Sequence, residues 1–260
     1  MKPNAATTAP AAEPDRLFIE AVARAFRVLE AFADAPQPLS LRELADRSGV
    51  DRSGAQRLAH TLVQLGYLEP VRGGLLPGRR LLERSFDYLR SNALVGRATP
   101  VLLELRRAAQ ERVDLTLFDD LTMLYAIRMQ SKRETFFTNL VGRRVPTFCS
   151  SGGHAVMSHL PAARVADILR RSPREKATPQ TTVDAASIKA RVRLARRLGY
   201  ALVSNELMTG IVAVAAPVLD PDGIPVGAVH IAGQLGEWQA DAFGRKFGPM
   251  AAEAAAAASK

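Results

Sequence analysis

Residues 39–68 read LSLRELADRSGVDRSGAQRLAHTLVQLGYL, and this stretch predicts two short helices joined by a tight turn. Ser40 and Glu43 have the spacing of a capping box, so we expect a helix to begin directly after Ser40. Gly49 ends that helix, because glycine adopts a left-handed backbone conformation without a steric penalty from a Cβ atom. Asp51 can accept hydrogen bonds from the amides at the start of the second helix.

The second helix has an apolar face and a polar face. Leu58, Leu62 and Leu65 recur at helical spacing and are expected to form its buried stripe. The opposite face carries side chains that can hydrogen-bond to base edges or phosphates in a major groove. Those residues are Arg52, Ser53, Gln56, Arg57 and His60. Taken alone, the helix pair fits two alternatives, a DNA-binding helix-turn-helix or an amphipathic pair whose polar face is only solvated.

The flanking segments favour the first alternative. Asp15 to Ala33 predicts a long helix, because apolar residues recur at helical spacing until Pro36 and Pro38 end it. Residues 66–78 predict a short β-hairpin that turns at Arg72-Gly73-Gly74. Three helices followed by a hairpin make a winged helix-turn-helix, in which the arginine at the wing tip can reach phosphate or the minor groove.

Length, composition and charge place the chain among folded globular proteins. Its 260 residues are 47% hydrophobic and 23% charged, which suits one large or two ordinary domains. A net charge of +9 favours an acidic partner, with nucleic acid the first candidate. Residues 1–96 carry a net charge of only +2 and residues 97–260 carry +7, so charge supports DNA binding by the helix pair only weakly.

Cys149 is the only cysteine, which excludes an intrachain disulfide and fits a reducing compartment. No stretch approaches the roughly 20 apolar residues of a membrane span. Residues 1–15 are rich in Ala, Pro and Thr, which predicts a disordered tail rather than a signal peptide. We therefore expect a cytoplasmic protein with no membrane partner.

The second half of the chain predicts an α+β domain. Arg79 to about Ser91 and Ala98 to Arg112 predict helices, separated by a break at Gly96. The period of the apolar residues then changes from 3.6 to 2, which predicts two β-hairpins and an antiparallel sheet. The expected elements are hairpins at 113–128, turning at Asp119-Asp120, and at 211–232, turning at 220–223, and helices after Ser150, at 184–198 and from 237 to about 258. We expect these helices to pack on one side of the sheet.

Several short pieces occur in a fixed order between residues 20 and 78. They are the run from Val22 to Glu30, Leu44-Ala45, Ser48-Gly49-Val50, Arg57-Leu58, Thr61-Leu62 and Leu65-Gly66-Tyr67. Together they resemble the N-terminal domain of the IclR family of bacterial transcription regulators. After the tail at 1–15, the resemblance implies a winged helix-turn-helix at 16–78, a linker helix at 79–97 and an effector-binding domain at 98–260.

The resemblance extends into the second domain. The matching pieces are Val141 to Pro146, Ser150 to Ala155 with Leu160-Pro161, Gly199-Tyr200, Glu206, Gly210 and Ala213 to Pro217. They resemble the family's pocket loop and its second signature, which implies a GAF-like fold with a small-molecule pocket on one face of the sheet. The resemblance covers roughly Arg16 to Ala257.

The resemblance also implies residues of that pocket. Ser151 and Gly152 correspond to positions that contact small organic acids, at a helix start whose amides and positive dipole end suit a carboxylate. The remaining implied lining residues are Leu140, Val203, Ala213, His230 and Ala232.

The chain departs from the family pattern around this pocket. His154 replaces a common lysine, Ala213 a common cysteine, and residues 203–205 an acidic run of which only Glu206 remains. His230 and Ala232 stand where small hydroxyl residues can occur, which leaves one wall more apolar and adds an imidazole. That imidazole either binds a carboxylate or phenol of the ligand or caps a buried carbonyl. We expect an aromatic or medium-length organic acid as effector.

Signals for catalysis are weak. Cys149, His154 and His159 are close in sequence, but no spacing shows a positioned base for a cysteine nucleophile. No phosphate loop, dinucleotide fingerprint or paired metal spacing occurs, so we expect no cofactor and no metal. The sequence thus predicts a regulator, repressor or activator, that binds a double-stranded operator as a homodimer or homotetramer. Two alternatives are a GAF-like enzyme and a DNA-binding protein whose second domain only oligomerises.

Overall fold

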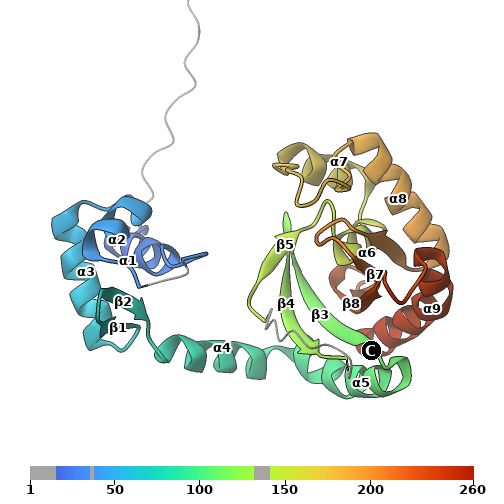
Figure 1. Ribbon diagram of the computed structural model, residues 1–260, viewed down its shortest axis with the longest axis horizontal. Helices are drawn as coiled ribbons and strands as arrows, with labels where there is room; N and C mark the ends of the chain where they lie inside the picture. The colour runs from blue at the N-terminus through green and yellow to red at the C-terminus, as the bar shows by residue number, and fades with distance from the viewer. Residues whose placement is uncertain (1–15, 36–37, 132–140) are drawn as a thin grey trace, which may run out of the picture. The chain divides into compact units, whose positions relative to one another are not determined.

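The computed structural model describes residues 16–35, 38–131 and 141–260, so the tail expected at 1–15 lies outside it. The chain divides into two compact units, residues 1–86 and 87–260 (Figure 1). Each unit has its own buried core. The boundary falls inside helix α4 (Arg80–Ser91). None of the helices in the described ranges has the length and apolar character needed to cross a membrane.

The first unit is a winged helix-turn-helix. Its elements before α4 are α1 (Glu20–Glu30), α2 (Leu41–Ser48), α3 (Arg52–Gln64), β1 (Leu68–Val71) and β2 (Gly74–Pro77). The predicted capping box is present, since Ser40 Oγ accepts from the Glu43 amide and the Glu43 carboxylate accepts from the Ser40 amide. Gly49 ends α2 at a φ of 64°, and Asp51 caps α3 by accepting from the Gly54 amide. These local predictions are confirmed.

Burial along α3 differs from the predicted leucine stripe. Leu62 is buried, but Leu65 is 48% exposed, and Ala55 and Ala59 fill the core-facing positions instead. Small side chains at these positions let α3 pack closely against α1 and α2. Helix α1 is also shorter than the predicted span of 15–33.

The second unit is one antiparallel sheet with helices on both faces. Its strands are β3 (Arg112–Asp119), β4 (Thr122–Met129), β5 (Arg144–Pro146), β6 (Ala201–Ser204), β7 (Ile211–Leu219) and β8 (Pro225–Gln234), in the spatial order β5-β4-β3-β8-β7-β6. Its helices after α4 are α5 (Ala93–Ala109), α6 (Ser151–Met157), α7 (Ala162–Arg171), α8 (Ala185–Leu198) and α9 (Ala240–Ser259).

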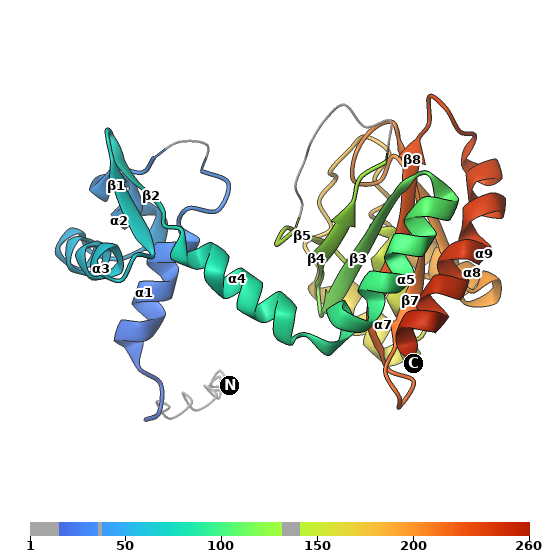
Figure 2. The ribbon, with the colours of Figure 1, turned by 90° about the horizontal axis from the view of Figure 1, so that it is seen from below.

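The arrangement of these helices corrects one prediction. Helices α5 and α9 lie side by side on one face of the sheet (Figure 2), and α6 packs on the other. Strands β7 and β8 are buried along most of their length, so both faces of the sheet need a cover. The expectation that the helices lie on one side only was therefore wrong.

Both predicted hairpins are confirmed as the pairs β3–β4 and β7–β8. The turn of the first is shifted by one residue from the prediction, since Asp119 pairs with Thr122 and the turn is Asp120-Leu121. The predicted helix break at Gly96 was wrong, because Gly96 lies inside α5. The break falls at Asn92, whose side chain accepts from the Val95 amide and starts a new helix there. Strands β5 and β6 are too short to show a period of their own. Helix α7 was missed by the prediction, although Val165, Ile168 and Leu169 have helical spacing.

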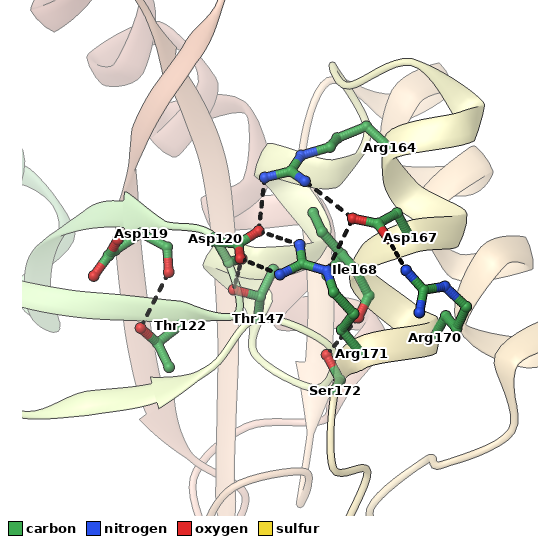
Figure 3. A network of polar contacts seen from close by, with 10 residues as sticks. All are labelled: Asp119, Asp120, Thr122, Thr147, Arg164, Asp167, Ile168, Arg170, Arg171 and Ser172. Carbon is green, nitrogen blue, oxygen red and sulfur yellow. Dashed lines mark hydrogen bonds and ion pairs between the residues drawn. The ribbon is translucent and has the colours of Figure 1, made fainter. Parts of the chain in front are cut away.

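An ion-pair network fastens the β3–β4 turn to α7 (Figure 3). The Asp120 carboxylate accepts from two nitrogens of Arg171, at 2.6 and 2.7 Å, and from Arg164 at 2.7 Å. The hydrogen bond from Arg171 is the main reason that the pKa of Asp120 is lowered. Thr147 Oγ1 donates to the Asp120 main-chain oxygen, so the turn is held from two directions.

Candidate functional sites

The exposed face of α3 presents the polar side chains that the sequence predicts to contact DNA. Arg52, Ser53, Gln56, Arg57 and His60 are all exposed. Three of them, Gln56, Arg57 and His60, line an open groove of about 820 Å³ whose other wall includes Val71 and Gly74 of the wing. The predicted recognition face and the β1–β2 hairpin therefore border the same concave surface.

Asp51 holds the start of α3 in place. Its carboxylate accepts from the Gly54 amide at 2.8 Å and from the Ser53 hydroxyl at 2.7 Å, and it pairs with Arg24 of α1. The Gly54 amide, followed by Ser53 and Arg24, lowers the pKa of Asp51 to about 2. Asp51 is thus ionised at neutral pH and connects α1 to α3. Because Ser53 donates its proton to Asp51, it offers a lone pair to a further partner.

The predicted wing is a tight hairpin. Val71 pairs with Gly74, which leaves exposed Arg72 and Gly73 as the turn, with a φ of 97° at Gly73. Leu39 bridges to Leu75 through two backbone hydrogen bonds of 3.0 and 2.8 Å, so the base of the hairpin is attached to the segment before α2.

A cavity of about 530 Å³ lies in the second unit, on the face of the sheet where α6 begins. We call it the effector pocket. Its polar lining includes Arg112, Asp114, Tyr125, Arg128, Gln130, Ser150, Ser151, Glu206 and His230. Its apolar lining includes Val203, Leu207, Met208, Ile211, Ala213 and Ala232.

The strand register explains why the two kinds of lining are separated. Arg112 pairs with Ala232, Ala232 with Ala213, and Ala213 with Val203, across β3, β8, β7 and β6. Side chains of directly paired residues stand on the same face of a sheet. This row therefore crosses the pocket floor from a charged end on β3 to an apolar end on β6.

A second row contains the buried charges of the pocket. Asp114 pairs with Arg128 on β4 and with His230 on β8. The Asp114 carboxylate, 1% exposed, accepts from Arg128 Nε at 2.8 Å and Nη2 at 3.1 Å, and from Arg112 Nε at 3.2 Å. A buried carboxylate requires such partners, because an unpaired buried charge costs several kcal/mol. Arg128 also lies over the Tyr125 ring, 5.1 Å from its centroid.

His230 is bonded through both ring nitrogens. Its Nε2 lies 2.8 Å from Thr116 Oγ1 and its Nδ1 lies 3.1 Å from Ser151 Oγ. Burial lowers the pKa of His230 to about 4, so the ring is neutral near pH 7. Of the two predicted roles, the capping of a buried carbonyl is not what the structure describes, since both partners are hydroxyl groups.

Glu206 holds the loop between β6 and β7. Its carboxylate accepts from the Thr182 amide at 2.7 Å and from the Thr182 hydroxyl at 2.8 Å, and it pairs with Arg191 of α8. Thr181 Oγ1 donates to the Glu206 main-chain oxygen at 2.6 Å. The loop that carries Leu207 and Met208 to the pocket is therefore attached to the segment before α8.

The structure brings most of the predicted pocket residues together. Ser151, Val203, Ala213, His230 and Ala232 all line the cavity. Gly152 lies under the His230 ring, because a Cβ atom added there would be 2.5 Å from His230 Cε1. Leu140 lies outside the described residues.

The helix whose start was expected to bind a carboxylate is short, and one of its first backbone amides already has a hydrogen-bond partner. Helix α6 has seven residues, and Ser150 Oγ already accepts from the Gly153 amide at 3.1 Å. The Ser151 hydroxyl is engaged by His230. These contacts leave less hydrogen-bonding capacity for a ligand than the sequence suggests.

Several polar residues on the floor and rim of the pocket were not predicted. They are Arg112, Asp114, Tyr125, Arg128 and Gln130, all at the β3–β4 side. The alternation of apolar and polar residues along β3 could have indicated some of them. Val113, Leu115 and Leu117 face the core, which assigns the charged and hydroxyl residues at 112, 114 and 116 to the opposite, buried face.

Cys149 and His154 are packed in the interior. Burial raises the pKa of the Cys149 thiol to about 12 and lowers that of His154 to about 4. His154 Nε2 donates to the Phe148 main-chain oxygen at 2.7 Å. A protonated, buried thiol is a poor nucleophile. Within the described ranges, no three His, Cys, Asp or Glu side chains are grouped in a way that could hold a metal ion.

Two family models match the chain. The model for the C-terminal domain of the bacterial transcriptional regulator IclR matches residues 86–260, and the IclR helix-turn-helix model matches residues 21–72. The Pca regulon regulatory protein of Pseudomonas putida is 26% identical over 241 residues, which cover 92% of this chain and 81% of that protein. The p-hydroxybenzoate hydroxylase transcriptional activator of Acinetobacter baylyi is 26% identical over 227 residues, 85% of this chain and 84% of that protein.

A solved structure shares the fold over nearly the whole chain. It is an IclR homolog from Microbacterium hydrocarbonoxydans in complex with 4-hydroxybenzoate. The TM-score is 0.77 at 22% identity, and the match covers 92% of this chain and 97% of that one.

Proposed function

Because the chain belongs to the IclR family of bacterial transcriptional regulators, we propose that a small organic acid in the effector pocket changes its affinity for an operator. The observation that carries this proposal is the charge around the pocket. Among its described lining residues, the cationic side chains are Arg112, Arg128, Arg143 and Arg144, and the anionic ones are Asp114 and Glu206. A concave site in which one sign of charge is in excess attracts ligands of the other sign.

The pocket size favours an aromatic or medium-length acid over a two-carbon acid. A dry cavity of about 150 Å³ holds benzene, and this pocket measures about 530 Å³. The related structure with bound 4-hydroxybenzoate supports the same ligand class for this chain. We propose that Ser151, His230 and the apolar residues at 203, 213 and 232 contact the ligand, and that Gly152, which lies under the His230 ring, positions that ring.

For the first unit, we propose that α3 lies in a major groove of double-stranded DNA. Its exposed polar face supplies the contacts to base edges and phosphates. Arg72 at the wing tip contacts phosphate or the minor groove. The proposed contact residues on α3 are Arg52, Ser53, Gln56, Arg57 and His60. Such binding requires a location with access to DNA, which in bacteria is the cytoplasm.

Effector control follows from population shift. The acid binds one arrangement of the protein more tightly than another, and the arrangements differ in operator affinity. We propose residues 79–97, which contain α4, as the linker that connects the domains at 16–78 and 98–260.

We further propose a homodimer, since paired helix-turn-helix units read half-sites about 34 Å apart. Large apolar side chains on and before α1 are exposed, with Phe18 at 60%, Val22 at 49% and Phe26 at 59%. Val22 and Phe26 are four residues apart, which puts them on one face of α1, and Phe18 lies in the segment directly before that helix. An exposed apolar face of this kind is typical of a protein interface.

Phe26→Asp combined with Val22→Asp is expected to disrupt the homodimer, because each change puts a charge into the proposed interface. Light scattering after size-exclusion chromatography measures the mass. The matched control is Ala21→Asp, which adds an acid at an exposed position about 100° around the helix. A tetramer that becomes a dimer would also support the interface, whereas an unchanged mass for the double variant would exclude it.

Footprinting on the DNA upstream of the protein's own gene tests the whole proposal. We expect salt-sensitive protection that changes when benzoate, 4-hydroxybenzoate or hexanoate is added. Protection that no acid alters would favour the alternative in which the second unit only oligomerises. Turnover of an acid without DNA binding would favour an enzyme and would contradict our proposal of a regulator without catalytic activity.

A further inference from the structure

Gln130 has an unsatisfied polar atom in the effector pocket. It follows the last residue of β4 and contributes to the lining. Among the described residues, its Oε1 is the only buried side-chain nitrogen or oxygen without a hydrogen-bond partner. Leaving such an atom unpaired is unfavourable, and native proteins contain few of them. An unpaired acceptor in a ligand pocket indicates a donor that the ligand supplies.

The backbone of Gln130 is held on two sides. Its main-chain oxygen accepts from Nε of Arg106 on α5. The preceding residue, Met129, pairs with Val113 on β3. Because side chains alternate along an extended chain, Gln130 lies on the same side as Arg128, and both line the pocket. The carboxamide is therefore attached to an anchored backbone.

The neighbouring charges select the chemistry of the donor. Arg112 and Arg128 also line the pocket, and the carboxylate beside them, Asp114, already accepts from both, so an ammonium group would meet an excess of like charge. A hydroxyl group is neutral and can donate to Oε1. It can also accept from the amide nitrogen, so it pairs with the carboxamide in either orientation.

We infer that Gln130 recognises a hydroxyl group of the effector at the β3–β4 end of the pocket. The apolar part of the ligand then faces Ala232, Ala213 and Val203 of the row that crosses the pocket floor, and its carboxylate faces Arg143 and Arg144, which line the β5 side of the pocket. This inference deepens the proposed function and rests on it, since it identifies the effector as a hydroxylated acid.

Calorimetric titrations of the full chain with three probes test separately whether the pocket binds an acid and whether Gln130 recognises a hydroxyl group. Benzoate carries the acid alone, phenol carries the hydroxyl alone, and 4-hydroxybenzoate carries both. We expect the wild type to bind 4-hydroxybenzoate about tenfold or more tightly than benzoate, because the hydroxyl satisfies the buried acceptor. In Gln130→Met, which keeps the length of the side chain, this ratio should fall to about one while the affinity for benzoate stays the same.

Gln234→Met is the matched control, since Gln234 also lines the pocket and is not among the buried unsatisfied atoms of the described chain. It should keep the preference for the hydroxylated acid. A ratio near one in the wild type, or an unchanged ratio in Gln130→Met, overturns the role of Gln130. If 4-hydroxybenzoate binds no more tightly than phenol, the acid proposal fails while the hydroxyl inference stands. If none of the three probes binds, both are overturned.

Discussion

Replacing Gln56 or Arg57 with alanine is expected to weaken operator binding by roughly 5- to 150-fold while the protein stays folded. A bidentate contact to a base contributes about 1–3 kcal/mol of discrimination, and each 1.4 kcal/mol is a factor of ten. Both side chains are exposed on α3, so their truncation leaves the core of the first unit intact. Gel-shift titration at fixed salt measures the affinity, and circular dichroism checks the fold.

Arg72→Ala provides the comparison within the same domain. A phosphate contact at the wing should weaken binding to every DNA sequence alike and lower the slope of log K against log salt by about one. A base contact should instead reduce the difference between operator and unrelated DNA. If Gln56→Ala and Arg57→Ala both bind the operator with wild-type affinity, α3 is not the recognition helix.

Gly152→Ala is expected to weaken the response to the effector strongly. An added Cβ atom would lie 2.5 Å from His230 Cε1, 2.7 Å from Nε2 and 3.1 Å from Thr116 Oγ1. The imidazole would have to move, and its hydrogen bonds to Thr116 and Ser151 would break. Overpacking of this kind costs about 1–3 kcal/mol, so the melting temperature should also fall. Titration with 4-hydroxybenzoate should show binding at least about tenfold weaker than in the wild type.

The matched control is Gly96→Ala, at a second helical glycine of the same unit. A Cβ atom at Gly96 meets nothing within 4 Å, so the change should be neutral or stabilise α5 by up to about 1 kcal/mol. Operator binding without effector should persist in both variants, because the first unit has its own core. A wild-type effector response in Gly152→Ala would show that the His230 ring does not shape the site.

Features that depend on neighbours in sequence could be predicted well. The capping box at Ser40, the left-handed Gly49 and the cap at Asp51 each involve residues no more than three or four positions apart. The turns of both sheet hairpins carry a similar local signal, at Asp120 and around Gly223. In each case one side chain or one residue that tolerates a positive φ determines where the helix or strand ends, so few other local conformations remain.

Features that depend on packing were harder to predict. Leu65 has the spacing of a buried residue and is exposed, while Ala55 and Ala59 contact the core. Helices cover both faces of the sheet, because period-2 alternation shows which residues share a face but not what covers it. Strand β6 has only four residues and pairs with β7 across a loop, so its hydrogen bonds give no periodic signal of their own.

The sequence by itself determined the two-domain α+β fold, the winged helix-turn-helix and the family, because these depend on local spacing and on the order of motifs. The tertiary structure alone decided which charges meet in the effector pocket. Asp114, Arg128 and His230 are far apart in sequence and become neighbours through the register of β4, β3 and β8. The tertiary structure also leaves Gln130 Oε1 buried and without a hydrogen-bond partner in the described part of the chain, in a residue that lines the pocket. Pairing between strands that are far apart in sequence brings such groups together, and a local sequence pattern does not show which strands will pair.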